Sequence, residues 1–201
     1  MSRKTESELL FESFCNLHDI PWKPVAVAGS RTPDYLVSLN DEGIYFEVKQ
    51  IDSDQAFNAL GVVHSRTVGS HIRQKILDSR KQVQVAKKAG VPGVLLIYNN
   101  LDPLQTFGTE QHDFISAMYG EMTVVLKGRD ITDSFHGRNS LLRENQNTSF
   151  SALAHLRRTS NGPTMRIYEN VFAHVGLNYE SLPQCIEVIH VQVDHSERPG
   201  G

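Results

Sequence analysis

A near-continuous apolar stretch over residues 93–98, GVLLIY, constrains the fold of this chain more than any other part of the sequence. Its length fits one strand, and the lack of alternation with polar residues is typical of a strand buried on both faces. The preceding segment, 70–89, carries apolar and small residues at helical spacing, with Ser70 as the expected N-cap and Gly90 just after the helix. We therefore expect an α/β fold in which helices flank a mixed central β-sheet.

The N-terminal part of the chain predicts one helix followed by three strands. Apolar side chains at helical spacing indicate a helix over residues 6–17, with Thr5 as its N-cap and Glu8 completing a capping box. Pro21 and Pro24 end this helix, because proline disfavours the helical conformation in the residue before it. The expected strands are a short one over 24–28 and a β-hairpin over 34–39 and 44–50, with its turn at 40–43.

The C-terminal half is less regular and predicts a β-rich extension of the same domain. The expected elements are a helix over 110–118 and strands over 122–126, 150–156, 165–168 and 186–193. The segments 51–69 and 129–147 are polar or without a clear period, so we expect long loops there. Since neither a repeat nor a shift in composition marks a boundary, we expect one domain over 1–195 and a disordered tail over 196–201.

Composition excludes several classes of protein. With 39% hydrophobic and 21% charged residues, the chain is too apolar for a disordered protein, and it has no apolar run of the roughly 18 residues that a membrane helix needs. No signal-peptide pattern is present, so we expect a cytoplasmic protein with no membrane partner. Two cysteines indicate neither a disulfide framework nor a cysteine-based zinc site. A net charge of −3 gives no broad basic field, although local basic patches can still bind phosphates.

One polar pattern carries the chemistry: Pro33-Asp34, followed thirteen residues later by Glu47-Val48-Lys49. The motifs of P-loop proteins, dinucleotide-binding proteins, zinc proteases and serine hydrolases are absent from the sequence. Alternate residues of a strand share a face, so Glu47 and Lys49 point the same way. In a hairpin with a two- or four-residue loop, Asp34 pairs with Glu47 or with Lys49, and both registers place all three side chains on one face. The opposite face is wholly apolar.

Two carboxylates this close repel each other when ionised, which a divalent cation would relieve. Mg²⁺ takes one or two protein carboxylates and leaves its other positions for water and for phosphate oxygens of a substrate. We therefore expect Asp34 and Glu47 to hold Mg²⁺, with Mn²⁺ as a substitute, and Lys49 to orient or deprotonate the attacking water. The competing interpretation is an exposed strand face with alternating charges, which is common in antiparallel sheets.

These residues and the order of elements resemble the PD-(D/E)xK nuclease superfamily, which has the restriction-endonuclease-like fold. The resemblance covers about the first hundred residues, in the order helix, three strands, helix, strand, and matches Asp34, Glu47 and Lys49 to the family's motif. It further implies a metal-binding glutamate on the first helix, where Glu8 and Glu12 are the candidates, and a catalytic glutamine on the later helix, where Gln82 is the candidate. It also implies that a homodimer is possible, since double-strand cutters of this kind often pair.

The sequence thus predicts a Mg²⁺-dependent phosphodiesterase that acts on nucleic acid, with DNA as the expected substrate. Two alternatives stay open: a non-catalytic module of the same fold that binds nucleic acid or protein, and a metal-dependent phosphodiesterase acting on nucleotides or sugar phosphates. The motif residues distinguish neither DNA from RNA nor endonuclease from exonuclease, because base recognition depends on loop geometry.

Overall fold

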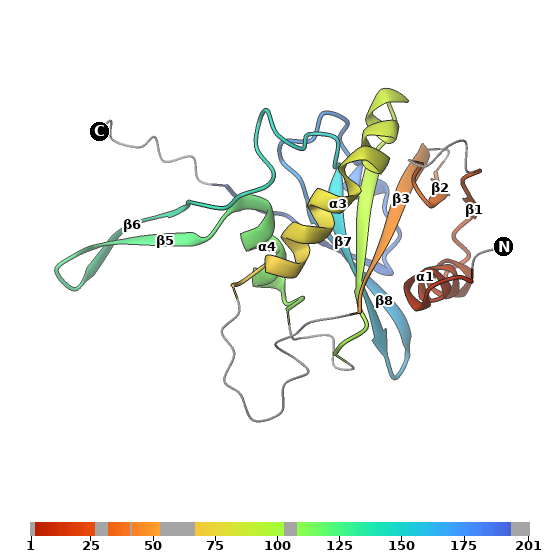
Figure 1. Cartoon of the computed structure of the whole chain (residues 1–201), viewed down its shortest axis with the longest axis horizontal. Helices are drawn as coiled ribbons and strands as arrows, with labels where there is room; N and C mark the ends of the chain where they lie inside the picture. The colour runs from red at the N-terminus through yellow and green to blue at the C-terminus, as the bar shows by residue number, and fades with distance from the viewer. Residues whose placement is uncertain (1–2, 27–31, 41, 53–66, 103–107, 194–201) are drawn as a thin grey trace.

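The computed structural model describes residues 3–26, 32–40, 42–52, 67–102 and 108–193, and its centre is a mixed seven-stranded sheet (Figure 1). The strand order is β1-β2-β3-β4-β7-β8-β9, in which β3, β4 and β7 are parallel and β8 and β9 are parallel, while the other neighbours are antiparallel. The bounds are β1 Trp22–Pro24, β2 Tyr35–Leu39, β3 Glu42–Ile51, β4 Gly93–Asn99, β7 Ala152–Thr159, β8 Gly162–Glu169 and β9 Ile186–Ile189.

Helices cover both faces of this sheet, as the apolar stretch 93–98 predicts. Helix α1 (Glu6–Leu17) covers one face, whereas α3 (Ser70–Lys88) and α4 (Gln111–Tyr119) cover the other; a short 3₁₀ helix, η1 (Tyr179–Ser181), precedes β9. Strand β4 is buried along its whole length and alternates its side chains between two hydrophobic cores. The α/β architecture with a mixed sheet flanked by helices is therefore present, and the C-terminal strands extend the same sheet.

Local sequence signals account for the ends of the helices. The predicted capping box at α1 is confirmed: Thr5 accepts a hydrogen bond from the Glu8 backbone, and the Glu8 side chain accepts one from the Thr5 backbone. The predicted cap of α3 is wrong, because Gly69 rather than Ser70 is the N-cap, with φ 72°. A Cβ at Gly69 would lie 2.6 Å from the Asp113 carbonyl oxygen, so close packing on α4 demands glycine there. Gly90, with φ 68°, follows α3 as expected.

The β2–β3 hairpin has the register that the two-residue loop predicts. Tyr35 lies opposite Phe46 and Leu39 opposite Glu42, and Asn40 in the turn has φ 47°. The apolar side chains of both strands enter the core beneath α1, as predicted; they are Tyr35, Val37, Leu39, Ile44, Phe46 and Val48. The opposite face of β3 carries Glu47 and Lys49.

Three expectations about strands need correction. The first strand begins at Trp22 and not at residue 24, because its pairing with β2 starts where Trp22 lies opposite Val37; the strand ends at Pro24, and residues 27–28 of the expected strand lie outside the described residues. The segment 129–147 is not all loop, since β6 (Asp130–His136) pairs with β5 (Met122–Lys127) in a ribbon that projects from the body (Figure 1). The last strand, predicted over 186–193, ends at Ile189, where its pairing with Tyr168 of β8 ends.

The expected excursion over 51–69 lies largely outside the described residues, as does the expected disordered tail over 196–201. Among the described residues, no helix is both long enough and apolar enough to cross a membrane.

Candidate functional site

The candidate site is built where β2 begins beside the middle of β3. Asp34 precedes β2 by one residue, and its backbone N–H donates to the Phe46 carbonyl oxygen at 3.0 Å, so Asp34 extends the hairpin by one step. Its carboxylate Oδ2 accepts a hydrogen bond from the Val48 backbone N–H at 2.8 Å. This bond fixes the Asp34 carboxylate between the two neighbours of Val48 on β3, Glu47 and Lys49.

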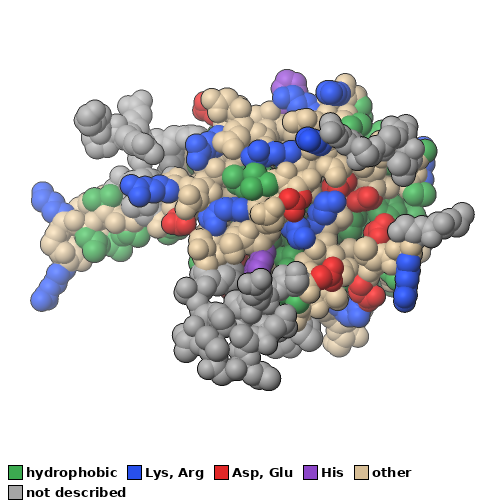
Figure 2. All heavy atoms as spheres, in the orientation of Figure 1, with side chains coloured by type: hydrophobic (Ala, Val, Ile, Leu, Met, Phe, Trp, Pro, Cys, Tyr) green, Lys and Arg blue, Asp and Glu red, His purple; other side chains and the backbone are tan. Residues whose placement is uncertain are grey.

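A cavity of about 400 Å³ opens at this point. Of the six candidate residues from the sequence, all except Glu12 line it. Its walls come from α1, the start of β2, β3 and α3, so segments distant in sequence converge there. The lining residues are Lys4, Glu8, Pro24, Val25, Thr32, Pro33, Asp34, Tyr35, Glu47, Lys49 and Gln82. Figure 2 shows acidic side chains close to basic ones over the part of the surface where α1 and β3 lie.

Glu47 is the most deeply buried of these side chains, with 1% of its surface exposed. Its Oε1 forms an ion pair with Lys49 Nζ at 2.6 Å, whereas Oε2 is buried without a hydrogen-bond partner among the described residues. Burial, followed by the charge of Asp34, raises the pKa of Glu47 to about 7, and Lys49 only partly opposes this rise. An ionised Glu47 therefore has one carboxylate oxygen to which no described residue donates a hydrogen bond.

Burial also raises the pKa of the partly exposed Asp34 above its ordinary value, and the charge of Glu8 adds to the rise. The hydrogen bond from Val48 and the charge of Lys49 act in the opposite direction. The pKa values of both carboxyl groups are thus raised. A proton or a cation between the two groups would reduce their electrostatic repulsion. Lys49 supplies only part of that positive charge.

The two candidate glutamates of α1 have different surroundings. Glu8 lines the cavity, although its Oε2 also accepts hydrogen bonds from the backbone N–H and the hydroxyl of Thr5, both at 2.7 Å. Glu12 does not line the cavity; its Oε1 accepts from the Tyr35 hydroxyl at 2.7 Å and forms an ion pair with Lys4 Nζ at 2.6 Å. The geometry therefore favours Glu8 over Glu12 as a third carboxylate.

Sequence reasoning missed three residues that shape this site. Lys4 and Tyr35 hold Glu12 and line the cavity, and Gln50 of β3 accepts a hydrogen bond from the Ser7 backbone N–H of α1 at 2.7 Å. This bond, which Ser7 donates to Gln50, attaches the start of α1 to β3, beside Lys49. Gln50 is a polar residue on the strand face that otherwise carries Phe46 and Val48. This break in the apolar pattern is the sequence signal that could have indicated a hydrogen bond between Gln50 and a neighbouring element.

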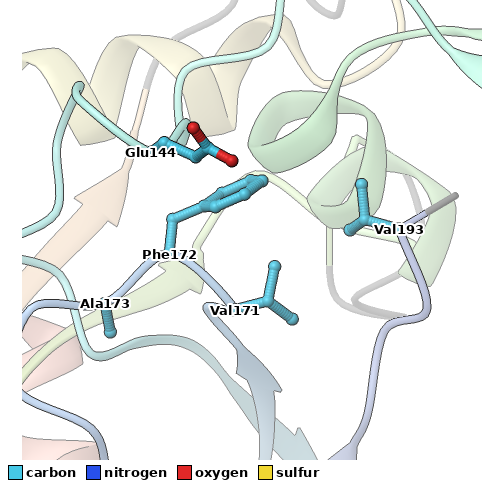
Figure 3. A pocket seen from close by; sticks show the side chains of 5 residues that line it. All are labelled: Glu144, Val171, Phe172, Ala173 and Val193. Atoms are coloured by element: carbon cyan, nitrogen blue, oxygen red, sulfur yellow. The ribbon is translucent and has the colours of Figure 1, made fainter. Parts of the chain in front are cut away.

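Two other features do not reproduce this chemistry. Glu110, His112 and Asp113 bring ligand atoms within 4.8 Å of one another at the start of α4. However, the Asp113 carboxylate accepts from the backbone N–H groups of Gly69 and Glu110, so this group caps the helix. A second hollow of about 500 Å³ has Glu144 beside the Phe172 ring as the one carboxylate among its described lining residues (Figure 3).

Comparison of the chain with protein-family models, with curated proteins and with solved structures finds no match.

Proposed function

We propose that this protein is a metal-dependent nuclease that hydrolyses phosphodiester bonds in nucleic acid, with DNA as the expected substrate. The observation that carries the proposal is the buried Oε2 of Glu47, which has no hydrogen-bond partner in the described part of the chain and lies with the Asp34 carboxyl and Lys49 in an open cavity. The large majority of buried side-chain polar atoms have a hydrogen-bond partner, so this oxygen calls for a group that satisfies it. An open cavity beside it leaves room for a cation and for a phosphate group.

The donor set fits Mg²⁺, and Mn²⁺ as its substitute. Both ions take carboxylate oxygens as ligands. Mg²⁺ usually binds one or two protein carboxylates and keeps several water molecules in its coordination sphere. Asp34 and Glu47 would hold the ion, and Glu8 faces the same cavity. Once bound, a divalent ion lowers the pKa of its water and neutralises charge that develops on the phosphoryl group.

Each protein side chain has a separate task in this proposal. Asp34 and Glu47 fix the position of the reacting phosphate by holding its counter-ion, and the Val48 hydrogen bond orients Asp34. Lys49 Nζ, anchored on Glu47 Oε1 and 27% exposed along its side chain, presents a positive charge to the phosphate and can orient the attacking water. Gln82 of α3 lines the same cavity, and its amide can both donate and accept hydrogen bonds, so it would support Lys49 or the substrate.

The order of elements supports the same proposal. Helix α1, strands β1 to β3, helix α3 and strand β4 follow one another in the order that the PD-(D/E)xK resemblance implies, with the motif residues at the start of β2 and in β3. We propose on this basis that these elements form a restriction-endonuclease-like core, with β7 to β9 as an extension.

A cleavage assay tests the proposal against its alternatives. Wild-type protein and Glu47→Gln are incubated with single-stranded, duplex and branched DNA and with RNA, each in Mg²⁺, Mn²⁺ or EDTA. Glu110→Gln is the matched control, because it removes an exposed carboxylate of the other acidic cluster. We expect cleavage by the wild type and by Glu110→Gln that requires metal and is lost in Glu47→Gln. Binding without cleavage in any metal would instead indicate a non-catalytic module.

A nucleotide or sugar-phosphate substrate is the remaining alternative. Mononucleotides and bis(p-nitrophenyl) phosphate in the same assay address it. Turnover of these small substrates without cleavage of any polynucleotide would contradict the nuclease proposal and leave the metal site intact.

A further inference from the structure

Three basic side chains gather on one face of β7 and β8, away from the candidate site. His155 and Arg157 are two residues apart on β7 and therefore share a face, and Arg166 of β8 lies directly opposite His155. Phe114 of α4 covers this face, with its ring centroid 5.3 Å from that of His155. Residues from two strands thus place three nitrogen-rich groups side by side, at the border of the core beneath α4.

Two polar atoms of this group are buried without a hydrogen-bond partner among the described residues. They are Nε2 of His155, a residue that is 2% exposed, and the buried Nε of Arg157. The buried hydroxyl of Tyr168 lies in the same group, near Arg166. Such atoms cost stability unless a water molecule or a ligand satisfies them.

The group also carries an excess of positive charge. Arg166 Nε donates to Glu187 Oε2 of β9 at 2.8 Å, and no other carboxylate is bonded to these side chains in the described part of the chain. Burial, reinforced by the charges of Arg157 and Arg166, lowers the pKa of His155 to about 3, so its ring is neutral at physiological pH. The neutral ring can still donate one N–H, and the two guanidinium groups remain charged.

We propose that His155, Arg157, Arg166 and Tyr168 form a binding site for a phosphoryl oxyanion. A tetrahedral phosphate has enough acceptor oxygens to satisfy donors that approach from different directions, and guanidinium groups match its geometry. The Arg157 guanidinium, on a partly exposed side chain, and the Arg166 side chain, 24% exposed, give the anion a way in from solvent. The ligand is either a free phosphate compound, such as a mononucleotide, or the terminal phosphate of a nucleic-acid strand.

This site is separate from the Asp34–Glu47 cavity. Lys49 lies opposite Ile97 of β4, and Ile97 lies opposite His155, so two strand spacings, about 10 Å, separate Lys49 from His155. Ile97 is fully buried between them. The proposal therefore does not rest on the proposed nuclease function, and either can fail without the other.

Phosphate binding to matched arginine variants tests the proposal. Isothermal titration with inorganic phosphate compares the wild type with Arg157→Met and with the control variant Arg158→Met. Arg158 is the next residue of β7, so it points to the opposite face of the sheet, where it pairs with Glu6. Loss of one charge-assisted contact predicts about tenfold weaker binding in Arg157→Met. Arg158→Met should bind phosphate as the wild type does. Equal weakening in both variants, or no saturable binding to the wild type, would overturn the proposal.

Nitrogen NMR of the His155 ring gives a second readout that needs no substitution. Saturating phosphate should shift the Nε2 resonance, whereas an unchanged resonance would mean that an ordered water alone satisfies Nε2 and would contradict the proposal. A mononucleotide and a dinucleotide with and without its 5′-phosphate then distinguish the two sources of the anion. Asp34→Asn should leave all of these binding results unchanged, which separates this site from the metal site.

Discussion

Metal binding at Asp34 and Glu47 should release a proton at acidic pH. With a pKa of about 7, Glu47 is roughly nine-tenths protonated at pH 6 and one-tenth protonated at pH 8 in the metal-free protein. Because a carboxylate must lose its proton to bind a metal, binding of Mn²⁺ should release about 0.9 proton at pH 6 and about 0.1 at pH 8. The apparent affinity should rise about tenfold between these two pH values.

Isothermal titration with Mn²⁺ in two buffers of different ionisation enthalpy measures this release directly. Lys49→Met is the informative variant, because Lys49 lowers the pKa of Glu47 and its loss should move proton release to higher pH. Heats that are identical in both buffers at pH 6, with binding intact, would refute the assignment of a protonated Glu47 to the site.

The same pKa sets the pH dependence of stability in EDTA. Between its ordinary value of 4.5 and about 7, Glu47 binds a proton in the folded chain but not in the unfolded one. The free energy of unfolding should therefore fall as pH rises through this window, by at most about 3 kcal/mol. Thermal melts from pH 4.5 to 8 measure it, and a contribution that rises with pH over this range would contradict the linkage.

Three further predictions concern single substitutions. In EDTA at pH 8, Asp34→Asn should melt at or above the wild-type temperature, because it keeps an acceptor for the Val48 N–H and removes a like charge. Mg²⁺ should raise the melting temperature of the wild type more than that of the variant. A variant that melts clearly lower in EDTA, with no effect of metal on either protein, would contradict the metal site. Lys49→Met should keep Mn²⁺ binding at pH 8 within about tenfold but lower cleavage at least about a hundredfold, as steady-state kinetics can measure. Glu8→Gln preserves the capping box and should lower cleavage activity about tenfold, whereas Glu12→Gln should change the activity less than about threefold. Equal effects of the two substitutions would remove the distinction between the two glutamates.

The parts of the fold that were predictable from the sequence are those set by short-range rules. The period-two alternation of a hairpin places Glu47 and Lys49 on one face, and the turn at Asn40 sets the register that brings Asp34 beside them. The capping box of α1 and the apolar stretch of β4 depend on spacing alone. These elements needed no knowledge of the tertiary structure.

Other features depend on packing between distant segments. The glycine cap of α3 is required by the close approach of α4, which the sequence around Gly69 does not contain. Strand β6 lies on a projecting ribbon, and among the described strands it pairs with β5 alone, so its formation does not depend on a face turned to the core. Glu8 rather than Glu12 lines the cavity because of how α1 packs on the sheet, and His155 lies opposite Arg166 because of the register between β7 and β8.

The most direct measurement is the location of Mn²⁺ by anomalous scattering in crystals of the wild-type protein. We predict one strong peak in the cavity, within bonding distance of carboxylate oxygens of Asp34 and Glu47. A protein saturated with Mn²⁺ that shows no peak there, or a peak only at the Glu110, His112 and Asp113 cluster, would contradict the central claim that Asp34 and Glu47 form a metal site.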